Sequence, residues 1–214
     1  MVGIAALFVA VSLTAGLNGD AVPFTSEGID MRLLLGSQAA IVVLTLAVAR
    51  LMGPTTTDQL RLGPPDGGPR AYLYAVLLML PVLATINGLI WTVWPDDALR
   101  DFLIFRDLAR SPYPLVPALA VSLGAPLSEE LLFRGFLLAP LASTRLGFWA
   151  AAMLVALVWT LLHWGYSAVG LAEVLAIGIY LSWTLYRTGS LRVALFCHAL
   201  YNSVLFILLR YMPA

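Results

Sequence analysis

The sequence predicts an all-α integral membrane protein, a polytopic helical bundle with about seven transmembrane helices. Three observations predict this fold class. Hydrophobic residues make up 61% of the 214-residue chain, and the mean hydropathy is +0.91. Charged residues make up only 11%, whereas a soluble domain usually carries about 25%. The apolar residues also gather into segments that can cross a hydrocarbon core about 30 Å thick.

Seven apolar segments follow one another along the chain, at residues 2–17, 33–49, 71–94, 115–141, 148–164, 169–186 and 191–211. The first lacks a basic leading region and a clear small-residue cleavage site, so we expect a retained helix; a signal peptide is the alternative. The Gly- and Pro-rich composition of residues 50–70 is typical of a flexible loop. Short turns join the last four segments, which favours sequential antiparallel neighbours.

We expect one continuous membrane domain with two parts. Residues 1–112 would form three transmembrane helices and an interfacial segment, and residues 113–214 a four-helix core that carries the motifs. The interfacial segment, residues 96–111, mixes acidic and basic residues with apolar ones, which favours an amphipathic helix in the membrane interface. Its apolar residues are Leu99, Phe102, Leu103, Ile104, Phe105 and Leu108.

Charge and cysteine content exclude some classes of partner and site. The formal net charge is zero, so no global field attracts nucleic acid. Cys197 is the only cysteine, which excludes an internal disulfide, and we expect it to pack as a small apolar residue. The positive-inside rule barely decides orientation, because six arginines lie in the loops on one side and five on the other. We take the N-terminus to lie inside.

Ionisable residues interrupt the apolar segments that would span the membrane. Glu129 and Glu130 are followed one helical turn later by Arg134, and both histidines, His163 and His198, also lie in apolar stretches. Carboxylates at membrane depth are costly and mark functional sites by default. The helical rise places Glu129, His163 and His198 roughly 18, 22 and 10 Å from the side of the turns near 145 and 189. The three groups can therefore share one layer.

Spacing within the helices separates these residues by role. Glu130 and Arg134 are four residues apart and face each other, which lets one carboxylate stay ionised. Glu129 is turned about 100° away and is available for chemistry. His198 and Asn202 are also four residues apart, so both can present donors to one point.

The predicted chemistry is hydrolysis of an amide by water. We assign Glu129 as the base, His163 as its partner on the water, and His198 with Asn202 as the oxyanion site. Glu130 and Arg134 would be a supporting pair that positions and tunes Glu129.

At these residues the chain resembles the CPBP family of intramembrane proteases, also called the CAAX protease and bacteriocin-processing or Abi family. The EExxxR motif is matched at Glu129, Glu130 and Arg134, and the HxxxN motif at His198 and Asn202. The FxxxH motif reads Trp159 to His163, with tryptophan in place of phenylalanine, a departure that we expect to change packing rather than chemistry.

The resemblance implies a glutamate-dependent intramembrane endopeptidase acting on a peptide or protein substrate, which is prenylated in the eukaryotic members. It implies Glu129 and His163 as the water-activating pair and His198 and Asn202 as the oxyanion stabilisers. We expect no cofactor and no metal, no nucleic-acid partner, and a place in the lipid bilayer of a prokaryotic cell membrane.

Other interpretations stay open at this point. Glu130 with Arg134 could be only a buried salt bridge. His198 and Asn202 could serve only to form hydrogen bonds between helices. A zinc site formed by Glu129, His163 and His198 is conceivable. The whole chain could also be a transporter, a bacteriocin immunity protein or a scaffold with a buried polar relay.

Two further polar residues lie in apolar segments. We expect Glu173 at the membrane interface, with a contact behind the site as the alternative. Asn87 is expected to be a helix-contact group.

Overall fold

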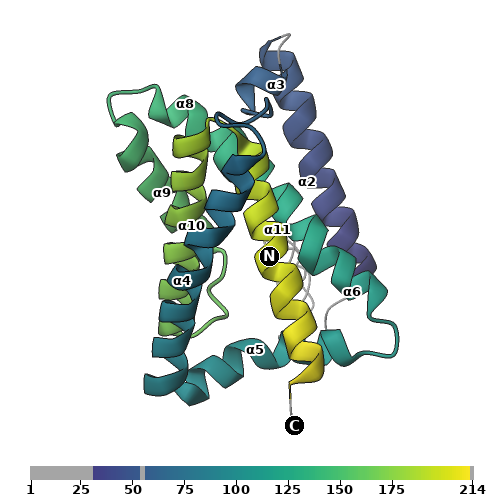
Figure 1. The fold of residues 1–214 in the computed structure, drawn as a ribbon. Coiled ribbons are helices and arrows are strands. Elements are labelled where there is room, and N and C mark those ends of the chain that lie inside the picture. Colours follow the sequence, from purple (N-terminus) through teal and green to yellow (C-terminus); the bar gives the residue numbers. More distant parts are fainter. Residues whose placement is uncertain (1–30, 54–55, 213–214) are drawn as a thin grey trace.

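The computed structural model of the protein describes residues 31–53 and 56–212, and every regular element assigned in them is helical (Figure 1). The expected first apolar segment, residues 2–17, lies outside the described residues. The long helices are α2 (Met31–Met52), α4 (Arg70–Val93), α5 (Pro95–Arg110), α9 (Gly147–Leu161), α10 (Ala168–Thr188) and α11 (Leu191–Tyr211). A short helix, α3 (Thr56–Gln59), lies within the segment that we expected to be a loop.

The predicted fourth span is one continuous helical rod built of alternating α and π turns. It comprises α6 (Leu115–Leu119), η2 (Ala120–Gly124), α7 (Ala125–Glu129), η3 (Glu130–Leu137) and α8 (Leu138–Ala142). The α-helical type is as predicted, but the two π segments are not. The second of them, η3, contains Glu130 and Arg134 of the first motif, and Glu129 directly precedes it.

The all-α fold class is confirmed, whereas the count of seven spans is not. Among the described residues, five helices are long and apolar enough to cross a membrane. The predicted fifth span is α9, which has 15 residues and is shorter than the others. Its helical rise covers about 22 Å, less than the thickness of a hydrocarbon core.

One end of the bundle is closed by hydrogen bonds between two turns that lie far apart in sequence. Arg61 O accepts from Leu191 N at 2.8 Å, and Thr188 O accepts from Asp66 N at 2.8 Å. Gly189 ends α10 with a φ of 64°, a left-handed conformation that glycine adopts without strain. These contacts place the loop before α4 and the α10–α11 turn at the same end of the molecule.

Helix α5 lies across the opposite end of the bundle (Figure 1). It begins at Pro95, carries Asp96 and Asp97 in its first turn and Arg110 in its last, an arrangement that suits the helix dipole. The predicted amphipathic helix therefore forms. Its buried side chains Phe102 and Phe105 belong to a cluster with residues of α11, so its apolar face covers the bundle.

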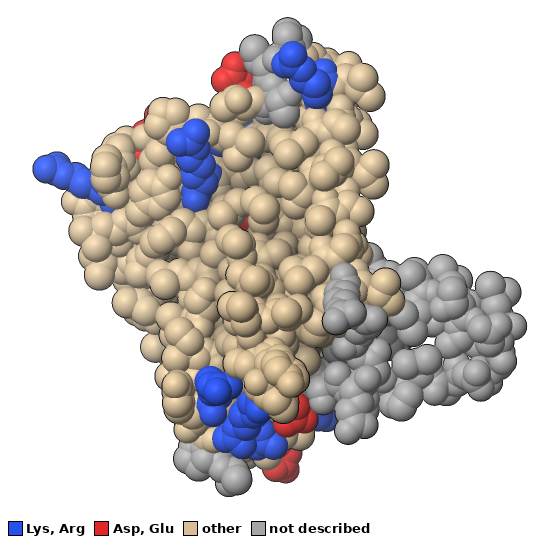
Figure 2. Space-filling model, turned by 90° about the vertical axis from the view of Figure 1, so that its right-hand side faces the viewer, with Lys and Arg blue, Asp and Glu red and all other residues tan. Residues whose placement is uncertain are grey.

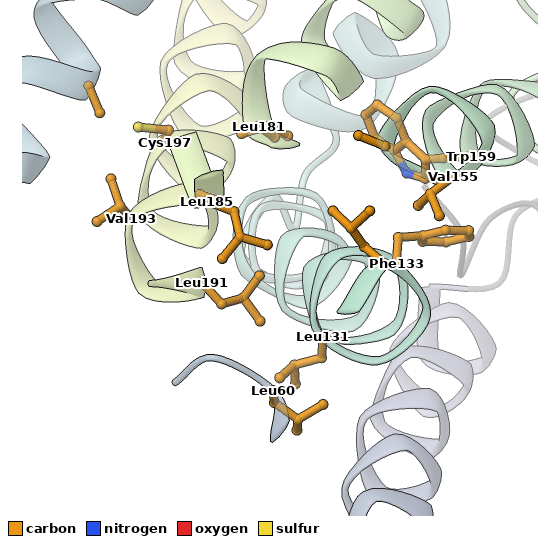
Figure 3. Close-up of a cluster of buried hydrophobic side chains, with 14 of the residues drawn as sticks. Leu60, Leu131, Phe133, Val155, Trp159, Leu181, Leu185, Leu191, Val193 and Cys197 are labelled. Carbon is orange, nitrogen blue, oxygen red and sulfur yellow. The ribbon is translucent and has the colours of Figure 1, made fainter. Parts of the chain in front are cut away.

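The rod that carries the motif glutamates runs through the middle of the main core. Figure 3 shows Leu131 beside Leu60 and Leu191, and Phe133 beside Val155. Because apolar residues occupy these faces of the rod, the glutamates of the same turns point elsewhere inside the protein. Both glutamates have no exposed surface.

The surface has the charge distribution of a membrane protein. Figure 2 shows charged side chains gathered at the two ends, with a broad face almost free of them in between. Large apolar side chains are exposed along the long helices, including Leu44, Tyr74, Leu77, Ile207 and Leu208. Lipid is the solvent in which such a surface is stable.

The first π segment has a cause in the sequence. Ala125 N donates to Ala120 O, a π-type bond that leaves the carbonyl of Val121 without its usual backbone partner. The next candidate donor would be residue 126, which is Pro126 and has no N–H. Val121 O instead accepts from the side chain of Asn202, Nδ2 to O 2.9 Å. A buried carbonyl orphaned in one helix thereby fixes a polar side chain of another.

Candidate active site

Glu130 and Arg134 form the predicted ion pair on one face of the rod. Arg134 Nη1 donates to Glu130 Oε1 at 3.0 Å, and both side chains are fully buried. Arg134 Nη2 also donates to Gly178 O at 3.3 Å. The guanidinium carbon lies 4.4 Å from the centre of the Trp159 ring, which makes a cation–π contact. The arginine therefore ties the rod to α9 and α10.

The carboxylate of Glu130 also holds His198. Its Oε1 lies 2.9 Å from His198 Nδ1, and because the carboxylate only accepts, Nδ1 carries the proton. This arrangement differs from our prediction that Glu130 and Arg134 would position Glu129. Their direct contact is with the histidine, whose other nitrogen, Nε2, lies 4.0 Å from Glu129 Oε2.

His163 lies just beyond the end of α9, where backbone carbonyls lack helical partners. Its Nδ1 is 2.7 Å from the carbonyl oxygen of Trp159. A carbonyl only accepts, so Nδ1 donates, and Nε2 of the neutral ring is left with a lone pair. The end of the helix thus sets the tautomer that a proton-accepting histidine needs.

Trp159 connects the polar groups of the site. Its Nε1 donates to Glu129 Oε2 at 2.8 Å, and its ring centre lies 4.8 Å from that of His163 and 5.7 Å from that of His198. We expected tryptophan in place of phenylalanine to alter only packing, and this was wrong. A phenylalanine has no N–H, so the hydrogen bond to Glu129 depends on the substitution.

Gly178 of α10 provides the space for this arrangement. A Cβ there would lie 3.0 Å from a ring carbon of Trp159 and 3.2 Å from Arg134 Nη2. A side chain at this position would push the indole or the guanidinium away from the site.

Asn202 lies near His198 on α11, but one of its two amide protons is engaged. Nδ2 donates to Val121 O, as described above. Its second proton has no hydrogen bond to the described residues and is available to a ligand. The predicted oxyanion residue is therefore held in place by one N–H and can donate with the other.

A cavity of about 70 Å³ adjoins these groups, enough for several water molecules. Trp159, His163, His198 and Asn202 line it, together with Val121 of the rod. These residues belong to the rod, α9 and α11 or lie directly after α9. The cavity walls also include Ile90 of α4 and Ala98, Asp101, Phe102 and Phe105 of α5.

Sequence reasoning missed two polar groups on the cavity wall. Glu173 was expected at the membrane interface, but it is buried, and its Oε1 accepts from Asn87 Nδ2 at 2.8 Å and Tyr201 Oη at 3.0 Å. The expectation that Asn87 is a helix-contact group is confirmed. Tyr201 could have been found from its place between His198 and Asn202 on one helix.

Asp101 is the second missed group. It accepts from Ser167 N at 2.9 Å and from Ser167 Oγ at 2.6 Å. Ser167 in turn caps α10, because its Oγ accepts from Gly170 N. Helix α5 thereby holds the segment between His163 and α10.

No group of three or more His, Cys, Asp or Glu side chains in the described ranges is arranged to hold a metal ion. Cys197 is buried in the main core, as expected for a packing residue.

Comparison with known proteins agrees with the motifs. Residues 111–204 match the model of the Rce1-like family, the type II CAAX prenyl endopeptidases. Neither the curated proteins nor the solved structures gave a match. The matched region contains all three motifs and the greater part of the predicted core, 113–214. Over residues 111–204 the chain is thus similar to the Rce1-like CAAX proteases, and the family resemblance drawn from the motifs is confirmed.

Proposed function

We propose that this protein is an intramembrane endopeptidase that hydrolyses a peptide bond of a membrane-associated or prenylated substrate with a water activated by Glu129. The observation that carries the proposal is the convergence of one acid and two imidazoles around the Trp159 ring, where both imidazoles line a cavity. The family match and the apolar helices support a CAAX-type protease embedded in a membrane.

We assign activation of the water to Glu129 and His163. The Oε2 of Glu129 accepts the indole N–H, and the carboxylate would accept a proton from the water. The lone pair on His163 Nε2 would accept a hydrogen bond from the same water and hold it in line. The water oxygen then bonds to the carbonyl carbon of the substrate, and the transferred proton resides on Glu129.

We assign stabilisation of the oxyanion to His198 and Asn202. The Nδ1–H of His198 is engaged by Glu130, so donation from Nε2 requires the protonated ring. The Glu130 carboxylate stabilises that cation through a charge-assisted hydrogen bond. The second amide proton of Asn202 would be the other donor. When the tetrahedral species collapses, the C–N bond breaks and Glu129 returns its proton to the leaving amine.

The test uses purified full-length protein with prenylated CAAX peptides and a small panel of membrane and leader peptides. Removing a general base reduces rate by about 10² to 10⁴, so we expect Glu129→Ala and His163→Ala to lose at least 99% of wild-type cleavage. Asp97→Asn, an exposed change on α5, serves as the control that keeps activity. Equal cleavage by wild type and both site variants would refute the proposal.

The same assay decides between glutamate and zinc chemistry. We expect activity to survive a chelator, because the proposed proton transfers need only the side chains described. Loss of activity that returns with added zinc would favour the metal alternative. Solute flux in proteoliposomes, together with no peptide cleavage, would favour the transporter alternative over the proposed endopeptidase.

A further inference from the structure

We propose that Glu173 forms a subsite for a positively charged side chain of the substrate, on the cavity wall between the catalytic groups and α5. This inference rests on the proposed endopeptidase function and names a chemical feature of its substrate. Its starting point is the buried carboxylate of α10 that the mechanism does not use.

Glu173 differs from the other buried acids in the partners that it has. Glu130 is paired with Arg134 and His198, and Asp101 with Arg100 and the capped start of α10. Glu173 is 8% exposed, and its recorded donors, Asn87 and Tyr201, are both neutral. Within residues 31–53 and 56–212, no arginine or histidine lies within ion-pair distance of it.

The two oxygens of this carboxylate are in different situations. Oε1 receives both hydrogen bonds. Oε2 has no hydrogen bond to the described residues. Because Glu173 lines the cavity, this oxygen can accept from a bound molecule. A carboxylate without a cationic partner is costly to bury, so a cationic group of a bound molecule is the partner that would stabilise it most.

The position of Glu173 suits a substrate held at the catalytic groups. It lies about 7.5 Å along α10 from Gly178, whose carbonyl binds Arg134. An extended peptide advances about 3.3 to 3.6 Å per residue. Because Glu173 and both imidazoles line the same cavity, a lysine or arginine a few residues from the scissile bond would reach it.

Tyr201 ties the subsite to the catalytic helix. Its hydroxyl binds Glu173, and it lies three residues after His198, on the same side of α11. The remaining walls are largely apolar, with Phe102, Phe105, Val174 and Leu205 among them. Such walls suit the methylene groups of a lysine while the ammonium group meets the carboxylate.

The experiment compares peptides that differ only in one charge. A peptide cleaved by the wild type carries either lysine or norleucine, moved in turn through the three positions on each side of the scissile bond. At one position we expect kcat/KM for lysine to exceed that for norleucine by at least tenfold. Glu173→Gln, which keeps an acceptor for Asn87 and Tyr201, is expected to bring the ratio to about one while norleucine cleavage persists. Asp97→Asn is expected to keep the wild-type ratio.

Binding separates failure of this inference from failure of the proposed function. Fluorescent forms of the same peptides are titrated against Glu129→Gln and against Glu129→Gln combined with Glu173→Gln. A lysine preference that disappears in the double variant supports the subsite even if the wild type cleaves nothing. Equal binding of lysine and norleucine peptides, no binding of either, or a preference that survives Glu173→Gln overturns it.

Discussion

At the scale of single residues, the site is organised by a tryptophan where the family motif has phenylalanine. The indole N–H fixes one oxygen of Glu129, the backbone carbonyl of the same residue fixes the tautomer of His163, and the ring lies under Arg134. One side chain therefore contacts both Glu129 and the groups around it. The motif pattern alone gives no sign of this, because the pattern has phenylalanine at this position, which carries no N–H.

Replacing this tryptophan tests the hydrogen bond. A bond to a charged acceptor contributes about 1.5 to 3 kcal/mol, and we expect Trp159→Phe to lower kcat about tenfold with KM little changed, because the base is less well positioned. Trp149→Phe, at a half-exposed tryptophan near the start of α9, is the matched control and should keep kcat. Unchanged kcat in Trp159→Phe, measured on folded protein, would mean that the N–H has no role in catalysis.

At the scale of the elements, a proline in one helix sets the position of an asparagine in another. Ala125 N bonds to Ala120 O in a π turn, Pro126 has no N–H to offer Val121 O, and Asn202 supplies the missing hydrogen bond. π turns inside α-helices are frequent at functional sites. Here the physical reason is that the turn exposes a carbonyl to a neighbouring side chain.

Restoring the backbone N–H tests this link between helices. In Pro126→Ala the new N–H competes for the carbonyls of the preceding turn, so Asn202 is less firmly held. We expect kcat to fall several-fold while the unfolding temperature stays the same or rises, because proline inside a helix is unfavourable. Thermal unfolding and cleavage are measured on the same preparation. A drop in stability with kcat unchanged would contradict the link.

At the scale of the whole molecule, the bundle has two chemically distinct ends. The loop before α4, the α8–α9 turn and the α10–α11 turn lie at one end, and α5 lies across the other (Figure 1). An apolar band separates them (Figure 2). A membrane would therefore separate Arg145, in the α8–α9 turn, from Tyr113, next to α5.

Cysteine labelling measures this orientation directly. The chain has one cysteine, Cys197, and it is buried, so background labelling is low. In intact cells we expect a membrane-impermeant maleimide to label Tyr113→Cys and to leave Arg145→Cys unlabelled until the membrane is permeabilised. Labelling of both without permeabilisation would contradict the two-ended arrangement, and the reverse pattern would invert the orientation.

The predictable part of this protein is what local chemistry fixes. Apolar segments predict helices, because backbone groups in lipid are satisfied only within them or in a closed barrel. Glu130 and Arg134 are four residues apart on one helix, so their pairing is also fixed locally. The amphipathic pattern of residues 96–111 likewise predicts the helix that forms there, α5.

The contacts between helices could not be predicted from the sequence. Depth along each helix indicated that Glu129, His163 and His198 could share a layer, but not that Glu130 would hold His198 or that Glu173 would be buried beside Tyr201. These pairings depend on how the helices rotate and pack, and no residue spacing encodes that rotation. The sequence by itself determined the membrane fold class and the residues of the motifs. Only tertiary packing decided which acid meets which imidazole, because that choice is made across helices rather than along them.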